Sequence, residues 1–153
     1  MLFRTHLLFS LLLGTLALGF FKLNPFLFLG LVVLGGMLPD IDKTTSVINN
    51  MLKVTKPIAH MVRHRGIFHS VFIGSLFAGL IAFYVNNEMG IALLMGYVGH
   101  LLLDGLNYAG LNLIHPLQKL HISGFIETGT ITEHVITLIL GALFLIRLKF
   151  MLF

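Results

Sequence analysis

Five apolar stretches divide the chain, and polar side chains stand at one end of each stretch. The stretches cover residues 7–21, 26–38, 67–85, 89–103 and 131–146. A helix that crosses the hydrocarbon core of a bilayer needs about 20 apolar residues, and only the third stretch approaches that length by itself. The others reach it only if a polar residue is counted inside the helix: His6, Asp40, His100 with Asp104, or Glu133 with His134. Polar groups at membrane depth are costly and persist mainly where they serve a function.

The composition agrees with a membrane protein. Of the 153 residues, 57% are hydrophobic and 10% are charged, against about 45–50% and about 25% in soluble domains. These values exclude a disordered chain and an ordinary soluble enzyme, and the ten scattered Lys and Arg residues predict no nucleic-acid partner. We predict an all-α fold with one integral-membrane domain over residues 1–153. It is a polytopic bundle of five apolar helices, or four if the short second stretch is re-entrant.

The connections between the stretches alternate between short and long, which predicts a topology. Residues 22–25 and 86–88 form tight turns, whereas residues 39–66 and 105–130 form long loops. A signal peptide is an alternative for the first stretch, but the restart at Asn24-Pro25 favours a helical hairpin. If all five stretches span the bilayer, the N-terminus and both long loops share one side. That side carries most of the basic residues: Arg4, Lys43, Lys53, Lys56, Arg63, Arg65 and Lys119. The positive-inside rule places this side in the cytoplasm.

The polar residues at the helix ends also fall on this side. The chain has eight histidines but only six acidic residues, and histidine is the commonest metal ligand. The candidate ligands, in chain order, are His6, Asp40, His69, His100, Asp104 and Glu133. Five helices that deliver imidazoles and carboxylates to one layer give the geometry of a metal site in a bundle core. No cysteine is present, which excludes thiolate ligands and disulfides.

Each pair of these residues also has a structural interpretation. His100 and Asp104 are four residues apart, so they share a helix face and could hold an ion together or only hydrogen-bond to each other. One of Asp40 and Asp42 could bind the metal while the other acts as a base behind that ligand. Alternatively, both could belong to an Asx-type turn at the end of a helix. Glu133 and His134 point about 100° apart on a helix, so we expect only one to face the site and favour Glu133.

The segment His64-Arg65-Gly66-Ile67-Phe68-His69-Ser70 has two interpretations as well. It could be a basic loop at the membrane interface. Alternatively, His69 faces inward as a ligand and Arg65 holds a phosphate, because guanidinium matches phosphate oxygens bidentately. Arg63 and Lys119 are further candidates for holding a phosphate, and His64 or Asp42 could accept a proton.

Five short motifs occur in order along nearly the whole chain: Thr5-His6, Leu38-Pro39-Asp40-Ile41-Asp42, His64-Arg65-Gly66-x-x-His69-Ser70, Gly99-His100-Leu101-x-x-Asp104 and Thr128-Gly129-Thr130-x-x-Glu133. Together they resemble the bacterial and archaeal family of inner-membrane metal-dependent hydrolases, some of which are LexA-regulated. The resemblance implies that His6, Asp40, His69, His100 and Asp104 hold the metal. Lys43 departs from the family, where histidine is common after the second aspartate. Ile114-His115-Pro116 also departs from it, because the resemblance implies an aromatic residue before the proline. The ligand order is also loosely similar to that of all-helical zinc phospholipases C.

A mixed set of nitrogen and oxygen ligands suits Zn²⁺, Mn²⁺ or Fe²⁺, and six ligands exceed one tetrahedral shell. We therefore expect one or two divalent ions, with Asp104 or Asp40 bridging if there are two. Such ions activate water, and a site at the membrane surface suits a substrate with a polar head and an apolar tail. The sequence thus predicts a hydrolase that cleaves a phosphoester of a lipid or lipid-linked substrate, with Asp42, His64 and Arg65 as catalytic residues.

Two alternatives remain open on the sequence alone. A metal-ion or proton transporter could use the same His/Asp cluster, because charged groups inside a membrane also mark ion paths. Such a protein would carry polar residues at several depths along its helices. A membrane adaptor with a structural metal and no catalytic activity is the second alternative.

Overall fold

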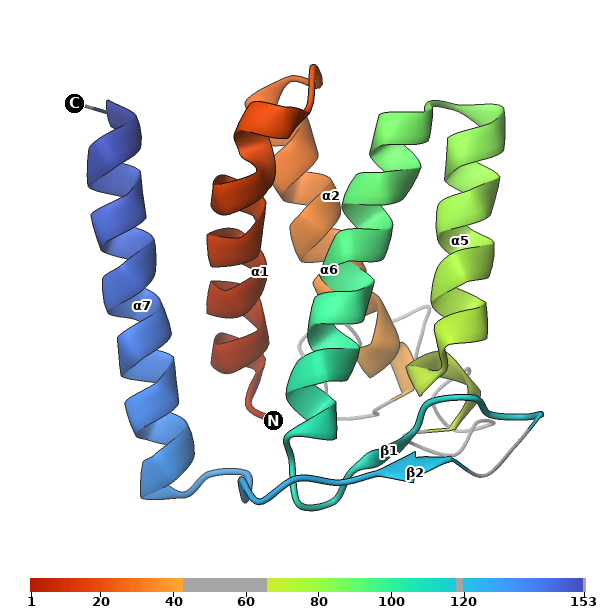
Figure 1. Cartoon of the computed structure of the whole chain (residues 1–153), viewed down its shortest axis with the longest axis vertical. Coiled ribbons are helices and arrows are strands. Elements are labelled where there is room, and N and C mark those ends of the chain that lie inside the picture. Colours follow the sequence, from red (N-terminus) through yellow and green to blue (C-terminus); the bar gives the residue numbers. More distant parts are fainter. Residues whose placement is uncertain (43–65, 118–119, 153) are drawn as a thin grey trace.

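The computed structural model describes residues 1–42, 66–117 and 120–152 and shows a helical bundle (Figure 1). Its α-helices are α1 (Phe3–Ala17), α2 (Pro25–Met37), α5 (Val71–Tyr84), α6 (Asn87–Gly105) and α7 (Ile131–Leu152). They alternate in direction, so the N-terminus and the end of α6 lie at the same end of the bundle (Figure 1). The predicted all-α class and the five helices are confirmed.

Three segments are long and apolar enough to cross a membrane: Phe3–Phe20, Pro25–Asp42 and Ile131–Met151. The second of them consists of α2 and the 3₁₀ helix η2 (Leu38–Asp42), which continues it. α2 runs antiparallel to α1 along the bundle (Figure 1). The second stretch therefore belongs to a helical segment of spanning length.

The two predicted tight turns are stabilised by helix caps and by a carboxylate that joins them. The side chain of Asn24 accepts hydrogen bonds from the backbone N–H groups of Phe26 and Leu27, at the start of α2. Asn86 caps α6 in the same way. Glu88 Oε2 then accepts the backbone N–H of Lys22 at 2.9 Å and that of Leu23 at 3.1 Å. Capping satisfies N–H groups that the first helical turn leaves unpaired.

Helices α2 and α6 approach closely because glycines line their contact. A Cβ added at Gly96 would lie 1.8 Å from the carbonyl oxygen of Val32, and one at Gly35 would lie 2.0 Å from that of Leu93. Small residues of this kind let backbones meet in membrane helix packing. The largest apolar core cluster surrounds this contact and includes Phe28 and Val32. Helix α7 stands at the edge of the bundle, beside α1 (Figure 1).

The chain between α6 and α7 forms a short hairpin where the sequence predicts only a loop. Strand β1 (Leu111–Asn112) pairs antiparallel with β2 (His121–Ile122), with Leu111 opposite Ile122. Strands of two residues are too short to show alternating hydrophobicity, so the sequence pattern does not predict them. The hairpin lies across the end of the bundle below α5 and α6 (Figure 1).

Candidate metal centre

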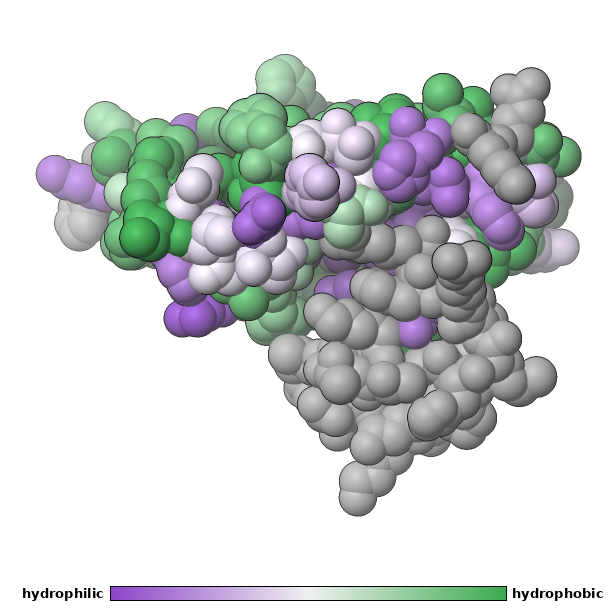
Figure 2. Space-filling model, turned by 90° about the horizontal axis from the view of Figure 1, so that it is seen from below, coloured by the Kyte–Doolittle hydropathy of each residue, from purple (hydrophilic) through white to green (hydrophobic). Residues whose placement is uncertain are grey.

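Polar residues from four elements meet at the end of the bundle that carries the N-terminus. His6 comes from the first turns of α1, Asp42 from η2, His69 from the 3₁₀ helix η4 (Ile67–His69), and His100 and Asp104 from the last turns of α6. Hydrophilic residues are visible across this end of the molecule, among hydrophobic ones (Figure 2). The structure thus brings together five of the polar residues that the sequence analysis assigned to this end of the bundle.

Asp104 lies at the centre of this cluster. Its Oδ1 is 2.8 Å from the amino group of Met1 and 3.4 Å from Nε2 of His6. Its Oδ2 is 3.5 Å from Nε2 of His69 and 3.7 Å from Nε2 of His100. The side chains of these three histidines and Asp104 are no more than 3% exposed. One oxygen of the Asp104 carboxylate therefore faces the imidazole of His6, and the other faces the imidazoles of His69 and His100.

The three imidazole rings are packed against one another. The rings of His6 and His100 stack with centroids 3.8 Å apart and planes 10° apart. The ring of His69 meets that of His100 edge-on, with centroids 5.3 Å apart. Residues that are 94 positions apart in the sequence are thus in direct contact.

The outer nitrogens of two rings are held by acceptors. His100 Nδ1 is 2.6 Å from the carbonyl oxygen of Gly36, and His69 Nδ1 is 3.1 Å from Oδ2 of Asp42. A carbonyl oxygen only accepts, so Nδ1 of His100 donates to Gly36, and Nε2 is the ring nitrogen left to bind a metal ion. A backbone carbonyl or a carboxylate behind a histidine is the usual support of a metal ligand. Both rings therefore turn Nε2 toward Asp104.

The donor set fits a divalent metal ion. Two groups of side chains can each place ligand atoms within 4.8 Å of one another: His6, His100 and Asp104, and Asp40, His69 and His100. His6 Nδ1 and His100 Nε2 are buried and have no hydrogen-bond partner among the described residues. A buried polar atom without a partner is costly, and a metal ion would remove that cost. Imidazole and carboxylate together suit Zn²⁺, Mn²⁺ or Fe²⁺.

Glu133, the sixth predicted ligand, lies outside both groups. Its Oε1 accepts the backbone N–H of Leu2 at 2.6 Å and the hydroxyl of Thr5 at 3.2 Å. Its Oε2 accepts the backbone N–H of Gly129 at 2.7 Å. This fully buried carboxylate joins the start of α7 to the start of α1. In this structure it positions the residues on either side of His6, and its role as a ligand stays a prediction.

Sequence reasoning missed two residues that shape the site. The hydroxyl of Tyr97 donates to the carbonyl oxygens of Phe68 and Ser70, on either side of His69. Tyr97 lies three residues before His100, so helical spacing could have placed it on the same face. Gly36 contributes only its carbonyl oxygen, for which the sequence carries no signal.

Four predicted residues lie outside the described part of the chain. They are the catalytic candidates His64 and Arg65 and the phosphate-binding candidates Arg63 and Lys119. Asp42, the third catalytic candidate, is described and buried against His69.

The family model for the YdjM inner membrane protein matches residues 1–152 of this chain. The chain belongs to the YdjM inner membrane protein family. It is 36% identical over 95 residues to the inner membrane protein YdjM of Escherichia coli K12, and a protein of the same name from Shigella flexneri matches equally. This match covers 56% of the chain and 47% of the E. coli protein, so the chain spans about half the length of that relative.

A Bacillus subtilis relative, the uncharacterized protein YvsG, is 23% identical over 136 residues. That match covers 87% of this chain and 85% of YvsG. No solved structure matches the chain. Together with the apolar helices, membership of the YdjM family confirms the predicted bacterial inner-membrane family and a multi-pass location in the inner membrane.

Proposed function

We propose that this protein is a metal-dependent hydrolase that cleaves a phosphoester of a lipid or lipid-linked substrate at the cytoplasmic surface of the membrane. One observation carries the proposal. Three imidazoles from three separate elements converge on Asp104, buried at one end of a membrane bundle. Burying several polar side chains in an apolar membrane bundle costs free energy, which favours a functional role for this cluster.

The residues themselves suggest how one or two ions would be held. His100 belongs to both ligand groups, but its single free nitrogen can bind only one ion. Asp104 directs Oδ1 toward His6 and Oδ2 toward His69 and His100. A carboxylate with imidazoles beside each oxygen is suited to bridge two ions, so we assign this role to Asp104. Asp40 would complete the ligand set on the side of His69.

A divalent ion held here would act as a Lewis acid and lower the pKa of a water molecule toward neutrality. The protein's own residues would do the remaining work. Asp42 and the carbonyl of Gly36 fix the ring orientations of His69 and His100. His64 is our candidate for the proton acceptor, and Arg63, Arg65 and Lys119 are our candidates for holding the phosphate.

The position of the cluster supports an amphipathic substrate. It lies at the end of α1 and of the α2–η2 segment, which are long enough to cross the hydrocarbon core, so in a bilayer it would lie near the level of the lipid headgroups. A lipid phosphoester presents its polar head at this level while its tail stays in the bilayer. A fully water-soluble substrate would gain nothing from a site embedded in the membrane.

Metal analysis of the purified protein tests the proposal. Wild type should bind one or two equivalents of a transition metal, and His100→Ala should lose metal and at least about 100-fold of hydrolysis of labelled phospholipids in mixed micelles. His134→Ala is the matched control, because His134 is exposed at the same end of the bundle. If wild type binds no transition metal, or His100→Ala keeps its full metal content, the proposal is wrong.

A structural metal centre is the second candidate, and burial favours it. The three histidines and Asp104 are at most 3% exposed, and closed sites are typical of structural metals. In that case metal removal would lower the melting temperature while wild type would show no hydrolysis. The transporter alternative gains less support, because the buried polar residues of α1 beyond the cluster, toward the other end of the bundle, are the uncharged Ser10 and Thr15.

A further inference from the structure

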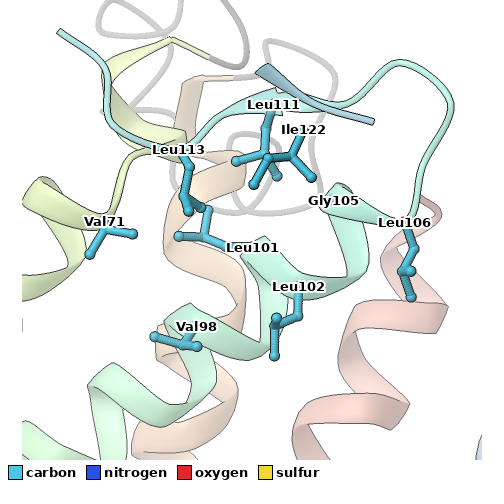
Figure 3. Close-up of a pocket in the computed structure, with 9 residues that line it drawn as sticks. All are labelled: Val71, Val98, Leu101, Leu102, Gly105, Leu106, Leu111, Leu113 and Ile122. Carbon is cyan, nitrogen blue, oxygen red and sulfur yellow. The ribbon is translucent and has the colours of Figure 1, made fainter. Parts of the chain in front are cut away.

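An apolar groove of about 330 Å³ lies between the start of α5, the end of α6 and the β1–β2 hairpin. Its nine lining residues are all apolar or glycine, and they include Val71, Val98, Leu101, Leu102, Gly105 and Ile122. Figure 3 shows side chains from these elements around the groove. The volume falls within the range of pockets that bind small molecules, about 300–1,000 Å³.

The groove lies at the same depth in the bundle as the metal centre. Leu101 directly follows His100, and Gly105 directly follows Asp104. Successive residues point about 100° apart on a helix, so the last turns of α6 present the cluster on one face and the groove on another. Val71 likewise begins α5 two residues after His69.

The groove continues into the surface that faces lipid. Ile91, Val98 and Leu102 are spaced seven and four residues apart on α6, which places them on one helix face. Their exposed fractions are 42%, 39% and 61%. In a bundle of the inner membrane, we expect this exposed apolar strip to face the hydrocarbon of the bilayer. The strip ends in the groove, so a hydrocarbon chain that enters the groove never leaves an apolar surface.

We propose that the groove binds one hydrocarbon chain of a membrane lipid, whose headgroup then lies at the depth of the metal centre. The described lining residues offer no polar side chain to a ligand, so they are suited to a hydrocarbon chain and not to a headgroup. Identifying this lipid as the substrate rests on the proposed function, whereas its binding does not.

Photolabelling with a lipid tests the groove. The probe is phosphatidylglycerol with a diazirine in one acyl chain, in vesicles of phosphatidylethanolamine and phosphatidylglycerol, and the labelled residues are mapped by mass spectrometry. A bound chain should label groove residues saturably at a low probe fraction, whereas bulk lipid labels in proportion to that fraction. Gly105→Leu should fill the groove, because a Cβ there already lies 3.8 Å from the Ile122 side chain. Labelling should fall about tenfold, equivalent to about 1.4 kcal/mol.

Gly79→Leu is the matched control, because a Cβ at Gly79 on α5 meets nothing within 4 Å. It should keep wild-type labelling. Val98→Phe should fill the groove as well. Because Val98 lies farther from Asp104 along α6, we expect labelling to fall while the metal content stays unchanged. Labelling that never saturates, or that persists in both filled variants, would overturn the proposal. Saturable labelling in a protein that hydrolyses no phosphoester supports the groove and contradicts only the proposed function.

Discussion

Among the described residues, Asp104 has the central position in the candidate metal centre. Its two oxygens face three imidazoles and the amino group of Met1, so one side chain joins α1, η4 and α6. The surrounding residues have different tasks: Asp42 and Gly36 hold histidines from behind, and Glu133 holds the backbone near His6. These roles can be separated by substitution.

Asp42→Asn tests whether Asp42 positions His69. Asparagine keeps an acceptor for Nδ1 of His69 but removes the negative charge that makes the imidazole a stronger ligand. We expect metal affinity to fall about 10–100-fold, the usual effect of losing the carboxylate behind a ligating histidine. Isothermal titration with Zn²⁺ measures it. Glu127→Gln, an exposed carboxylate at the same end, should have no effect, and unchanged affinity in Asp42→Asn would contradict the assignment.

Glu133→Gln distinguishes a positioning residue from a ligand. Glutamine has one side-chain oxygen in place of two, so either the Leu2 N–H or the Gly129 N–H, both in part-buried hydrogen bonds, loses its acceptor. We expect the free energy of unfolding to fall by about 1–3 kcal/mol, measured as a lower melting temperature, with metal content retained. A folded variant without metal would instead establish Glu133 as the ligand that the sequence pattern favours.

At the scale of elements, the site depends on how closely α2 and α6 pack. The Gly36 carbonyl reaches Nδ1 of His100 because Gly35 and Gly96 let the two backbones meet one to two turns away. The 3₁₀ helix η2 then continues α2 to the end of the bundle and delivers Asp42 to His69. The packing of two helices therefore sets the orientation of two ligands.

Gly96→Ala should push these helices apart. The added Cβ would lie 1.8 Å from the Val32 carbonyl, so the backbones must separate, at a cost of about 1–3 kcal/mol. Metal affinity should weaken as well, because the support of His100 depends on the same approach. Melting temperature and metal titration measure both effects. Gly30→Ala, where a Cβ meets nothing within 4 Å, should be neutral or slightly stabilising, and equal effects of both variants would contradict this account.

At the scale of the whole molecule, alternating helix direction gathers the candidate ligands at one end (Figure 1). The other end holds the two capped turns that Glu88 joins. Membership of the YdjM family places the bundle in the inner membrane, and the distribution of Lys and Arg predicts that the ligand end faces the cytoplasm.

Cysteine labelling tests this orientation. The chain has no cysteine, so Asn87→Cys and Lys119→Cys each introduce a single thiol. A membrane-impermeant maleimide added to spheroplasts should label Asn87→Cys and should reach Lys119→Cys only after lysis. Labelling of Lys119→Cys alone from outside would show that the ligand end faces the periplasm, and labelling of both thiols from outside would contradict the proposed topology.

Much of the site could be predicted from residue spacing. His100 and Asp104 share a face of one helix, and the alternation of short and long connections brought His6, Asp42 and His69 to the same end. The roles within the cluster could not be predicted in this way. Glutamate is a residue type that commonly binds metal ions, so the sequence alone suggests a ligand at Glu133. Only the contacts of its oxygens with Leu2 and Gly129 show what they bind in the structure.

The sequence by itself determined the membrane class, the five helices and the end of the bundle at which the polar residues lie. These properties follow from local hydrophobicity and helix direction, which each segment carries within itself. Only the tertiary structure decided which atoms face one another: the stacking of His6 on His100, the support of His100 by Gly36, and the apolar groove beside the cluster. Those contacts depend on how closely separate helices approach, and backbone carbonyls and side-chain packing leave no periodic pattern in the sequence.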